Sequence, residues 1–138
     1  MTTSDQACTA IFDRWITQWG TTTPFKFMGE TTKLEEGAVP YVILGVVHEP
    51  RQRDGQITLG AIGNRKFDRQ GRIELLLSTL AKDGRSPLDG LQHTARGIFE
   101  ARRFSGVQCY DGEFRETGID GKWHTGRVDI LFSYQEIK

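Results

Sequence analysis

The sequence predicts an α+β fold: an antiparallel β-sheet with an N-terminal helix and a second helix packed on one face. Two amphipathic helical stripes, one near the N-terminus and one after residue 85, predict the helices, and alternating or β-branched runs elsewhere predict the sheet. The chain has 138 residues, the usual size of one domain, so we assign residues 1–138 to a single domain.

Residues 5–19 have the apolar spacing of an amphipathic helix. Apolar side chains recur there every three or four residues: Ala7, Cys8, Ile11, Phe12, Trp15, Ile16 and Trp19. Ser4 or Asp5 is expected to cap the start. Gly20 stands where the residue after a helix adopts a left-handed conformation, so the helix is expected to end there.

A second helix is indicated by Ser86-Pro87, a serine N-cap followed by proline at the first helical position. Its predicted apolar stripe comprises Leu88, Leu91, Ala95, Ile98 and Phe99. Arg102 and Arg103 are expected to complement the dipole in its last turn. Gly90 and Gly97 weaken a helix, so we expect them where it packs closely on a neighbour.

The remaining runs are expected to be strands. They cover residues 25–27, 40–49, 57–67, 72–80, 107–117 and 122–135. Residues 68–71 are a plausible hairpin turn, which would make residues 51–72 part of an extended hairpin arm. Residues 118–121 contain Asp120-Gly121, a strong hairpin signal. In the last strand, alternate residues from Val128 to Tyr134 are expected to share one face.

Composition excludes several classes of protein. Eighteen basic and eighteen acidic residues leave no net charge to attract nucleic acid or an anionic membrane. No apolar run approaches the roughly 20 residues of a membrane span, and the first residues lack a secretory-signal pattern. Cys8 and Cys109 lie far apart, and we expect both to be free thiols of a protein made in the cytoplasm.

No pattern of reactive side chains predicts a catalytic, cofactor or metal site, so we expect no enzyme activity and no cofactor. His48, His93 and His124 lack the spacing of metal ligands, and no serine lies in a nucleophile elbow. Glu113 and Glu116 could act in acid–base chemistry, but with Arg115 between them surface ion pairing explains them better.

The most unusual feature is the charge between residues 51 and 72. This segment contains two carboxylates, Asp54 and Asp68, and six cations, which gives a net charge of 6 − 2, or +4. The cations are Arg51, Arg53, Arg65, Lys66, Arg69 and Arg72. Phe67 is expected at the tip of this arm. The arm could be a solvated hairpin that discourages edge pairing, a contact for an acidic neighbouring subunit, or a segment that passes close to phosphate.

Several segments, in this order, resemble proteins of the tailed-bacteriophage tail-terminator, or tail-completion, family. These segments are Ile11-Phe12 with Trp15 and Trp19, residues 22–25, Pro40-Tyr41-Val42, residues 64–71, and residues 120–136 with Trp123. The resemblance extends from about residue 7 to residue 136 and rests on the order and spacing of short motifs.

This resemblance implies a structural virion protein of the tail or neck, assembled in the cytoplasm of the host bacterium. Such a protein would form a ring, usually a hexamer, that caps the major tail tube protein and meets a head-completion or neck protein. DNA would pass through the ring without sequence-specific binding, and no membrane would be involved. Alternatives are a head–tail connector and, from another class, a DNA-binding module that uses the basic hairpin 51–72.

Ring formation would join unlike surfaces of neighbouring subunits. The cations and aromatic of the arm, Arg51, Arg53, Arg65, Lys66, Phe67 and Arg69, are the candidates for one surface. The acidic residues Glu35, Glu36, Glu113 and Glu116 are the candidates for the other.

Overall fold

In a computed structural model, which describes residues 3–20, 22–29, 39–48 and 65–137, the N-terminal stripe forms helix α1 (Ser4–Trp19). Its cap is Thr3 and not Ser4 or Asp5. The Thr3 hydroxyl accepts from the Gln6 backbone N–H, and the Gln6 side chain accepts from the Thr3 N–H, which forms a capping box. Gly20 ends the helix with φ 59°, as predicted.

The second predicted helix is α2 (Ser86–Phe99), and its predicted stripe is buried. Three details differ. Arg85 occupies the N-cap position without a side-chain cap bond, so Ser86 is not the cap. The helix ends at Phe99, so Arg102 and Arg103 lie beyond it. A Cβ on Gly90 or Gly97 would meet no atom within 4 Å, so neither glycine marks a close helix contact.

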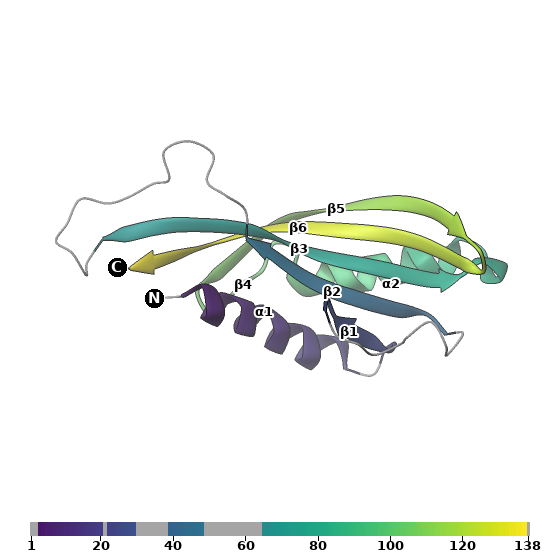
Figure 1. The fold of residues 1–138 in the computed structure, drawn as a ribbon, viewed down its shortest axis with the longest axis horizontal. Helices are drawn as coiled ribbons and strands as arrows, with labels where there is room; N and C mark the ends of the chain where they lie inside the picture. The colour runs from purple at the N-terminus through teal and green to yellow at the C-terminus, as the bar shows by residue number, and fades with distance from the viewer. Residues whose placement is uncertain (1–2, 21, 30–38, 49–64, 138) are drawn as a thin grey trace.

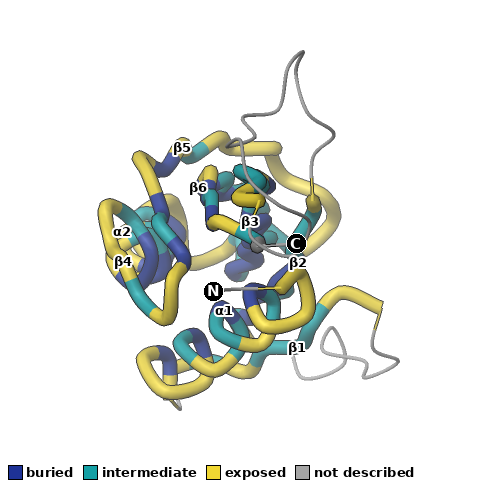
Figure 2. The backbone as a smooth tube through the Cα atoms, turned by 90° about the vertical axis from the view of Figure 1, so that its left-hand side faces the viewer, coloured by how far each residue is buried: buried dark blue, intermediate teal, exposed yellow. Residues whose placement is uncertain are grey.

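In the described ranges, six strands form one curled sheet around the helices (Figures 1 and 2). They are β1 (Phe25–Phe27), β2 (Tyr41–His48), β3 (Lys66–Leu80), β4 (Arg103–Phe104), β5 (Val107–Asp120) and β6 (Trp123–Ile137). Their order is β1-β2-β3-β6-β5-β4. The fold is α+β, as predicted, but the sheet is mixed: β1 pairs with β2 in parallel. The long connection between β1 and β2 permits this direction, because parallel neighbours need about a dozen linking residues or more.

The predicted turn at residues 68–71 is wrong, because β3 runs unbroken through it. Its composition resembles a turn, yet Gly71 is required there for a different reason. A Cβ on Gly71 would meet the carbonyl oxygen of Val47 and, at 2.7 Å, the ring of Phe132. The glycine therefore allows β2 and β6 to approach β3 closely. The hairpin signal at Asp120-Gly121 is confirmed, with Gly121 at φ 60° between β5 and β6.

One hydrophobic core of the described residues lies between the helices and the sheet. Figure 2 shows buried positions in both helices and in the central strands. Trp15 stacks on Trp19 at 4.5 Å between ring centroids and contacts Phe25 edge-on at 6.0 Å. The predicted inward face of β6 is confirmed, since Val128 to Tyr134 are buried at alternate positions. The two helices are tied by the Arg14 Nε–H, which donates to the Ile98 carbonyl at 2.7 Å.

Cys109 belongs to this core and is fully buried, whereas Cys8 is partly exposed on α1. Burial raises the pKa of the Cys109 thiol to about 12, and it also raises the pKa of Cys8. Because the thiolate is the reactive form, both cysteines are poor nucleophiles at neutral pH.

Substitution of Leu75, near the centre of β3, tests how much the core contributes to the free energy of unfolding. Leu75→Ala should reduce the free energy of unfolding by about 2–5 kcal/mol, because it removes apolar contacts and leaves a cavity. Leu131→Ala on β6 is the matched control: its side chain is 53% exposed, and a change within about 0.5 kcal/mol is expected. Urea unfolding followed by tryptophan fluorescence measures both, and equal losses would contradict the assignment of the two faces.

Candidate interaction surfaces

The first surface is a two-stranded ribbon that projects beyond the body of the sheet. Pairing of β2 with β3 starts at His48 and Gly71, and pairing of β5 with β6 stops at Gln108 and Ser133. The pairing of β3 with β6 continues to Lys66 and Ile137. The first five residues of β3 and the end of β6 therefore leave the body together, at the left of Figure 1. An isolated pair of strands is only marginally stable in water, so the ribbon depends on side-chain contacts between its two strands for stability.

The ribbon carries four of the predicted interface residues: Arg65, Lys66, Phe67 and Arg69. Arg69 pairs with Glu136 on the opposite strand at 3.3 Å, and its guanidinium lies 5.1 Å from the Phe67 ring centroid. Phe67 pairs in register with Glu136, so it lies along the ribbon and not at the tip of a hairpin. A projecting basic arm exists, but it is formed by β3 and β6, which are distant in sequence.

A groove of about 640 Å³ lies where the ribbon meets the turn between β4 and β5. Polar and apolar atoms contribute similar shares of its walls. The lining residues are Lys66, Asp68, Arg69, Gln70, Arg103, Gly106, Gln108, Tyr110, Ser133, Tyr134 and Gln135. The hydroxyls of Tyr110 and Ser133 lie 2.7 Å apart and join β5 to β6. Most of these residues belong to no sequence motif. Only the strand register brings them together, so sequence patterns do not predict the groove.

The ribbon is braced at its base by His48. Its Nε2 lies 2.9 Å from the Tyr134 hydroxyl and 3.4 Å from the Ser4 hydroxyl. These contacts join the end of β2, the start of α1 and the inner face of β6. Burial raises the pKa of Tyr134, and the hydrogen bond with Ser4 opposes that rise. The phenol therefore stays protonated at neutral pH and available for this contact.

The helix-free face of the sheet carries a charged cluster around Glu74, whose side chain is 10% exposed. Its Oε1 accepts from Arg72 Nε and from an Arg127 terminal nitrogen, both at 2.7 Å. Arg127 also pairs with Asp129 at 2.8 Å. A carboxylate this shielded from water needs such partners, because unpaired burial of a charge is costly.

The two predicted acidic residues of β5 have different environments. Glu113 is exposed, stands opposite Asp129 in register and has no ion pair among the described residues. Arg115 is also exposed, stands opposite Arg127 and is likewise without an ion pair in the described part of the chain. Like charges directly opposite each other destabilise a strand pair. Glu113 and Arg115 therefore lie on one face of β5, each opposite a like charge and each without an ion pair within 4 Å in the described subunit.

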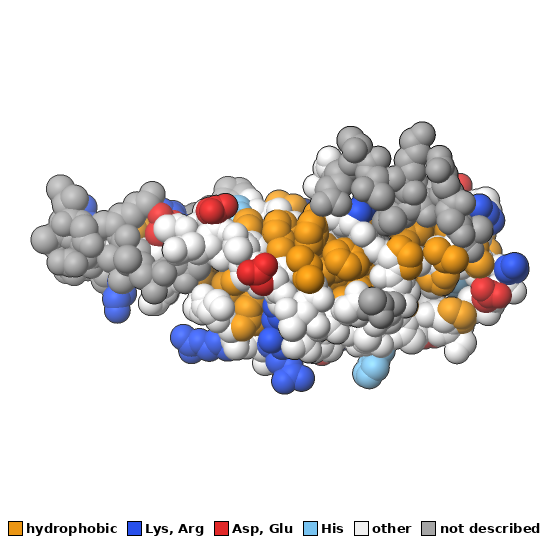
Figure 3. Space-filling view, turned by 90° about the horizontal axis from the view of Figure 1, so that it is seen from below, with side chains coloured by type: hydrophobic (Ala, Val, Ile, Leu, Met, Phe, Trp, Pro, Cys, Tyr) orange, Lys and Arg blue, Asp and Glu red, His pale blue; other side chains and the backbone are white. Residues whose placement is uncertain are grey.

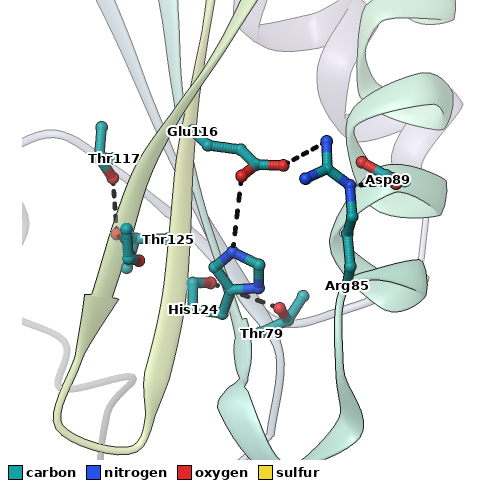
Figure 4. Close-up of polar contacts among 8 residues, drawn as sticks. Thr79, Arg85, Asp89, Glu116, Thr117, His124 and Thr125 are labelled. Carbon is teal, nitrogen blue, oxygen red and sulfur yellow. Dashed lines mark hydrogen bonds and ion pairs between the residues drawn. The ribbon is translucent and has the colours of Figure 1, made fainter.

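Glu116 lies on the other face of β5 and connects it to α2 (Figure 4). Its carboxylate pairs with Arg85 at 2.6 Å, and Arg85 also pairs with Asp89 at 3.1 Å. His124 Nε2 lies 4.0 Å from the Glu116 carboxylate. The expected partner, Arg115, is therefore replaced by a residue at the start of α2. The group serves to tie α2 to the β5–β6 hairpin.

An apolar surface covers α1 and β1. The rings of Phe12 and Phe27 contact each other in a tilted arrangement, with their centroids 4.4 Å apart. Ile16 and Met28 are 48% and 49% exposed. Figure 3, seen from the side of α1, shows hydrophobic side chains gathered on this face. Patches of this kind commonly mark contact surfaces.

The structure thus gathers Arg65, Lys66, Phe67 and Arg69 on the ribbon but does not bring Glu113 and Glu116 to them within one subunit. Arg51, Arg53, Glu35 and Glu36 lie outside the described residues. Within the described ranges, no three His, Cys, Asp or Glu side chains are placed to hold a metal ion. The helices of the described chain are too short or too polar to cross a membrane.

No family model and no curated protein matches this sequence. A solved protein structure is similar over the whole chain, with a TM-score of 0.68. The similarity covers 100% of this chain and 99% of the other at 14% sequence identity, and the name of that protein states no function. A likeness at this identity establishes the fold alone.

Glu74 offers a test of the charged cluster. Glu74→Gln should reduce the free energy of unfolding by about 1–3 kcal/mol, because both arginines lose a charged acceptor. Glu113→Gln on β5, which is separated from β3 by β6, is the matched control, and it should change stability by less than about 0.5 kcal/mol. Chemical unfolding at low ionic strength measures both; a neutral Glu74→Gln would show that the cluster contributes nothing.

Proposed function

We propose that this protein is a structural component of a tailed-bacteriophage particle. It forms a closed ring, a hexamer, that caps the major tail tube protein and joins it to the head-completion or neck protein during assembly. The ring belongs to the tail or neck of the virion, is assembled in the host cytoplasm, and lets DNA pass without reading its sequence.

The observation that carries this proposal is the unlike character of two surfaces on one subunit. The ribbon projects at one end with exposed Arg65 and Lys66. β5 exposes Glu113 and Arg115, opposite like charges, on the helix-free face of the sheet. A contact between unlike surfaces, repeated by rotation, generates a closed ring. In such a contact the ribbon of one subunit would approach β5 of the next, with Glu113 near its cations.

The apolar surface on α1 and β1 supports a second type of contact. A ring between a tube and a neck must bind different proteins above and below, in addition to its own copies. Phe12 and Ile16 lie on α1 and Met28 follows β1, whereas the ribbon is formed by the ends of β3 and β6 (Figure 1). This separation would leave an apolar face free for the tube when the ring has formed.

Two alternative functions can be distinguished from a tail-capping ring by experiment. A head–tail connector would share the ring but bind portal or adaptor protein in place of tail tube protein. A DNA-binding module would use the cations of the ribbon, and its affinity for DNA would fall steeply as salt rises. A ring component should show no such steep dependence.

Reversing the charge of the ribbon tests the ring. Arg65→Glu with Lys66→Glu should abolish the hexamer, six times the 15.6 kDa of the chain, because the contact with acidic residues becomes repulsive. Size-exclusion chromatography with light scattering gives the mass, alone and with tail tubes of the same particle. Electron microscopy of the tube ends shows whether a ring is bound.

Lys82→Glu with Arg102→Glu is the matched control, since it reverses two exposed cations outside the ribbon. This control should assemble as the wild type does. A wild-type chain that stays monomeric and leaves tube ends uncapped would refute the proposal, and so would an unchanged ring in the ribbon variant. Capture of portal protein in place of tube protein would favour the connector.

A further inference from the structure

The groove beside the ribbon has the features of a peptide-binding site. β5 pairs with β6 only as far as Ser133, where the chain turns away toward β4. β6 continues to Gln135 and beyond along β3, and the groove lies beside this continuation. A sheet edge of this kind can accept an added strand through backbone hydrogen bonds.

The side chains of the groove match an extended, polar chain. Gln70, Gln108 and Gln135 each offer amide donors and acceptors, which complement peptide groups. The hydrogen bond between Tyr110 and Ser133 holds two further hydroxyls in place. The volume of about 640 Å³ lies within the range of about 300–1,000 Å³ that is typical of ligand sites.

The charged side chains of the groove favour a ligand with negative charge. Three cations, Lys66, Arg69 and Arg103, line it with one carboxylate, Asp68, and Arg69 is already paired with Glu136 on β6. Arg103 is exposed and forms no ion pair with any described residue, so its charge is available to an incoming anion. A carboxylate on the bound chain would pair with this arginine.

We propose that this groove binds an extended acidic peptide segment of a partner protein, added as a strand beside the end of β6. Backbone contacts to β6 would hold the segment, the glutamines and hydroxyls would fix its register, and Arg103 would pair with an acidic side chain. The groove lies within one subunit, so this inference goes beyond the ring proposal, although Lys66 and Arg69 belong to both surfaces.

The test uses the full chain labelled with ¹⁵N and three eight-residue peptides in which threonine alternates with glutamate, glutamine or lysine. The glutamate peptide should shift the backbone amide signals of Gln108, Tyr110, Ser133 and Gln135. It should bind at least about tenfold more tightly than the lysine peptide, because one charged contact contributes about 1.4 kcal/mol or more. Absence of these shifts, equal binding of both peptides, or shifts confined to α1 would overturn the proposal.

Arg103→Glu should weaken binding of the glutamate peptide about tenfold or more, and Arg102→Glu is the matched control. Both arginines are exposed, adjacent and without ion pairs in the described structure, but only Arg103 lines the groove. Equal losses of affinity in the two variants would show that only long-range electrostatic attraction is involved, and would contradict binding in the groove. A single-stranded oligothymidylate that produces the same shifts at lower concentration would assign the groove to phosphate in place of peptide.

Discussion

The pairing of β3 with β6 is the constraint on which the rest of the structure depends. Two fifteen-residue strands pair without a break from Lys66 and Ile137 at one end to Leu80 and Trp123 at the other. Their inward residues supply the centre of the core, and every other strand is added to one side or the other of this pair. Because both neighbours, β2 and β5, are offset toward the other end, the pair must project as a ribbon. The projecting arm is a consequence of register and not a separate insertion.

The same pair gives its two faces different chemistry. On the inward face, Ile73, Leu75 and Ile130 are fully buried beneath the helices. On the helix-free face, Glu74 lies almost as deep, and two arginines offset the cost of shielding its charge. This face therefore resembles neither a core nor a freely solvated surface. Its neighbouring strand β5 leaves Glu113 and Arg115 opposite like charges, an arrangement that a facing subunit could relieve.

The sequence predicts those parts of the fold that depend on local periodicity. The helices, the inward face of β6 and the Asp120-Gly121 hairpin are confirmed because each depends on spacing or on one turn residue. The failures concern contacts between distant segments. Gly71 resembles a turn residue, but it is needed because Val47 and Phe132 leave no room for a Cβ. The parallel direction of β1 follows from where its connection leads, which a three-residue strand cannot encode.

The candidate surfaces are less predictable from the sequence than the fold, because they also depend on contacts between distant segments. The basic character of Arg65, Lys66 and Arg69 is visible in the sequence, because it is a local excess of charge. The groove is invisible there, because Arg103, Gln108 and Ser133 come from three strands that only the tertiary fold joins. Its polarity nevertheless has a physical origin in the fold. A ribbon that leaves the core loses its apolar cover, so side chains at its base must remain compatible with water until a partner replaces that water. Such a surface is hydrated in the free subunit, and it still offers a fixed set of hydrogen-bonding groups to a partner.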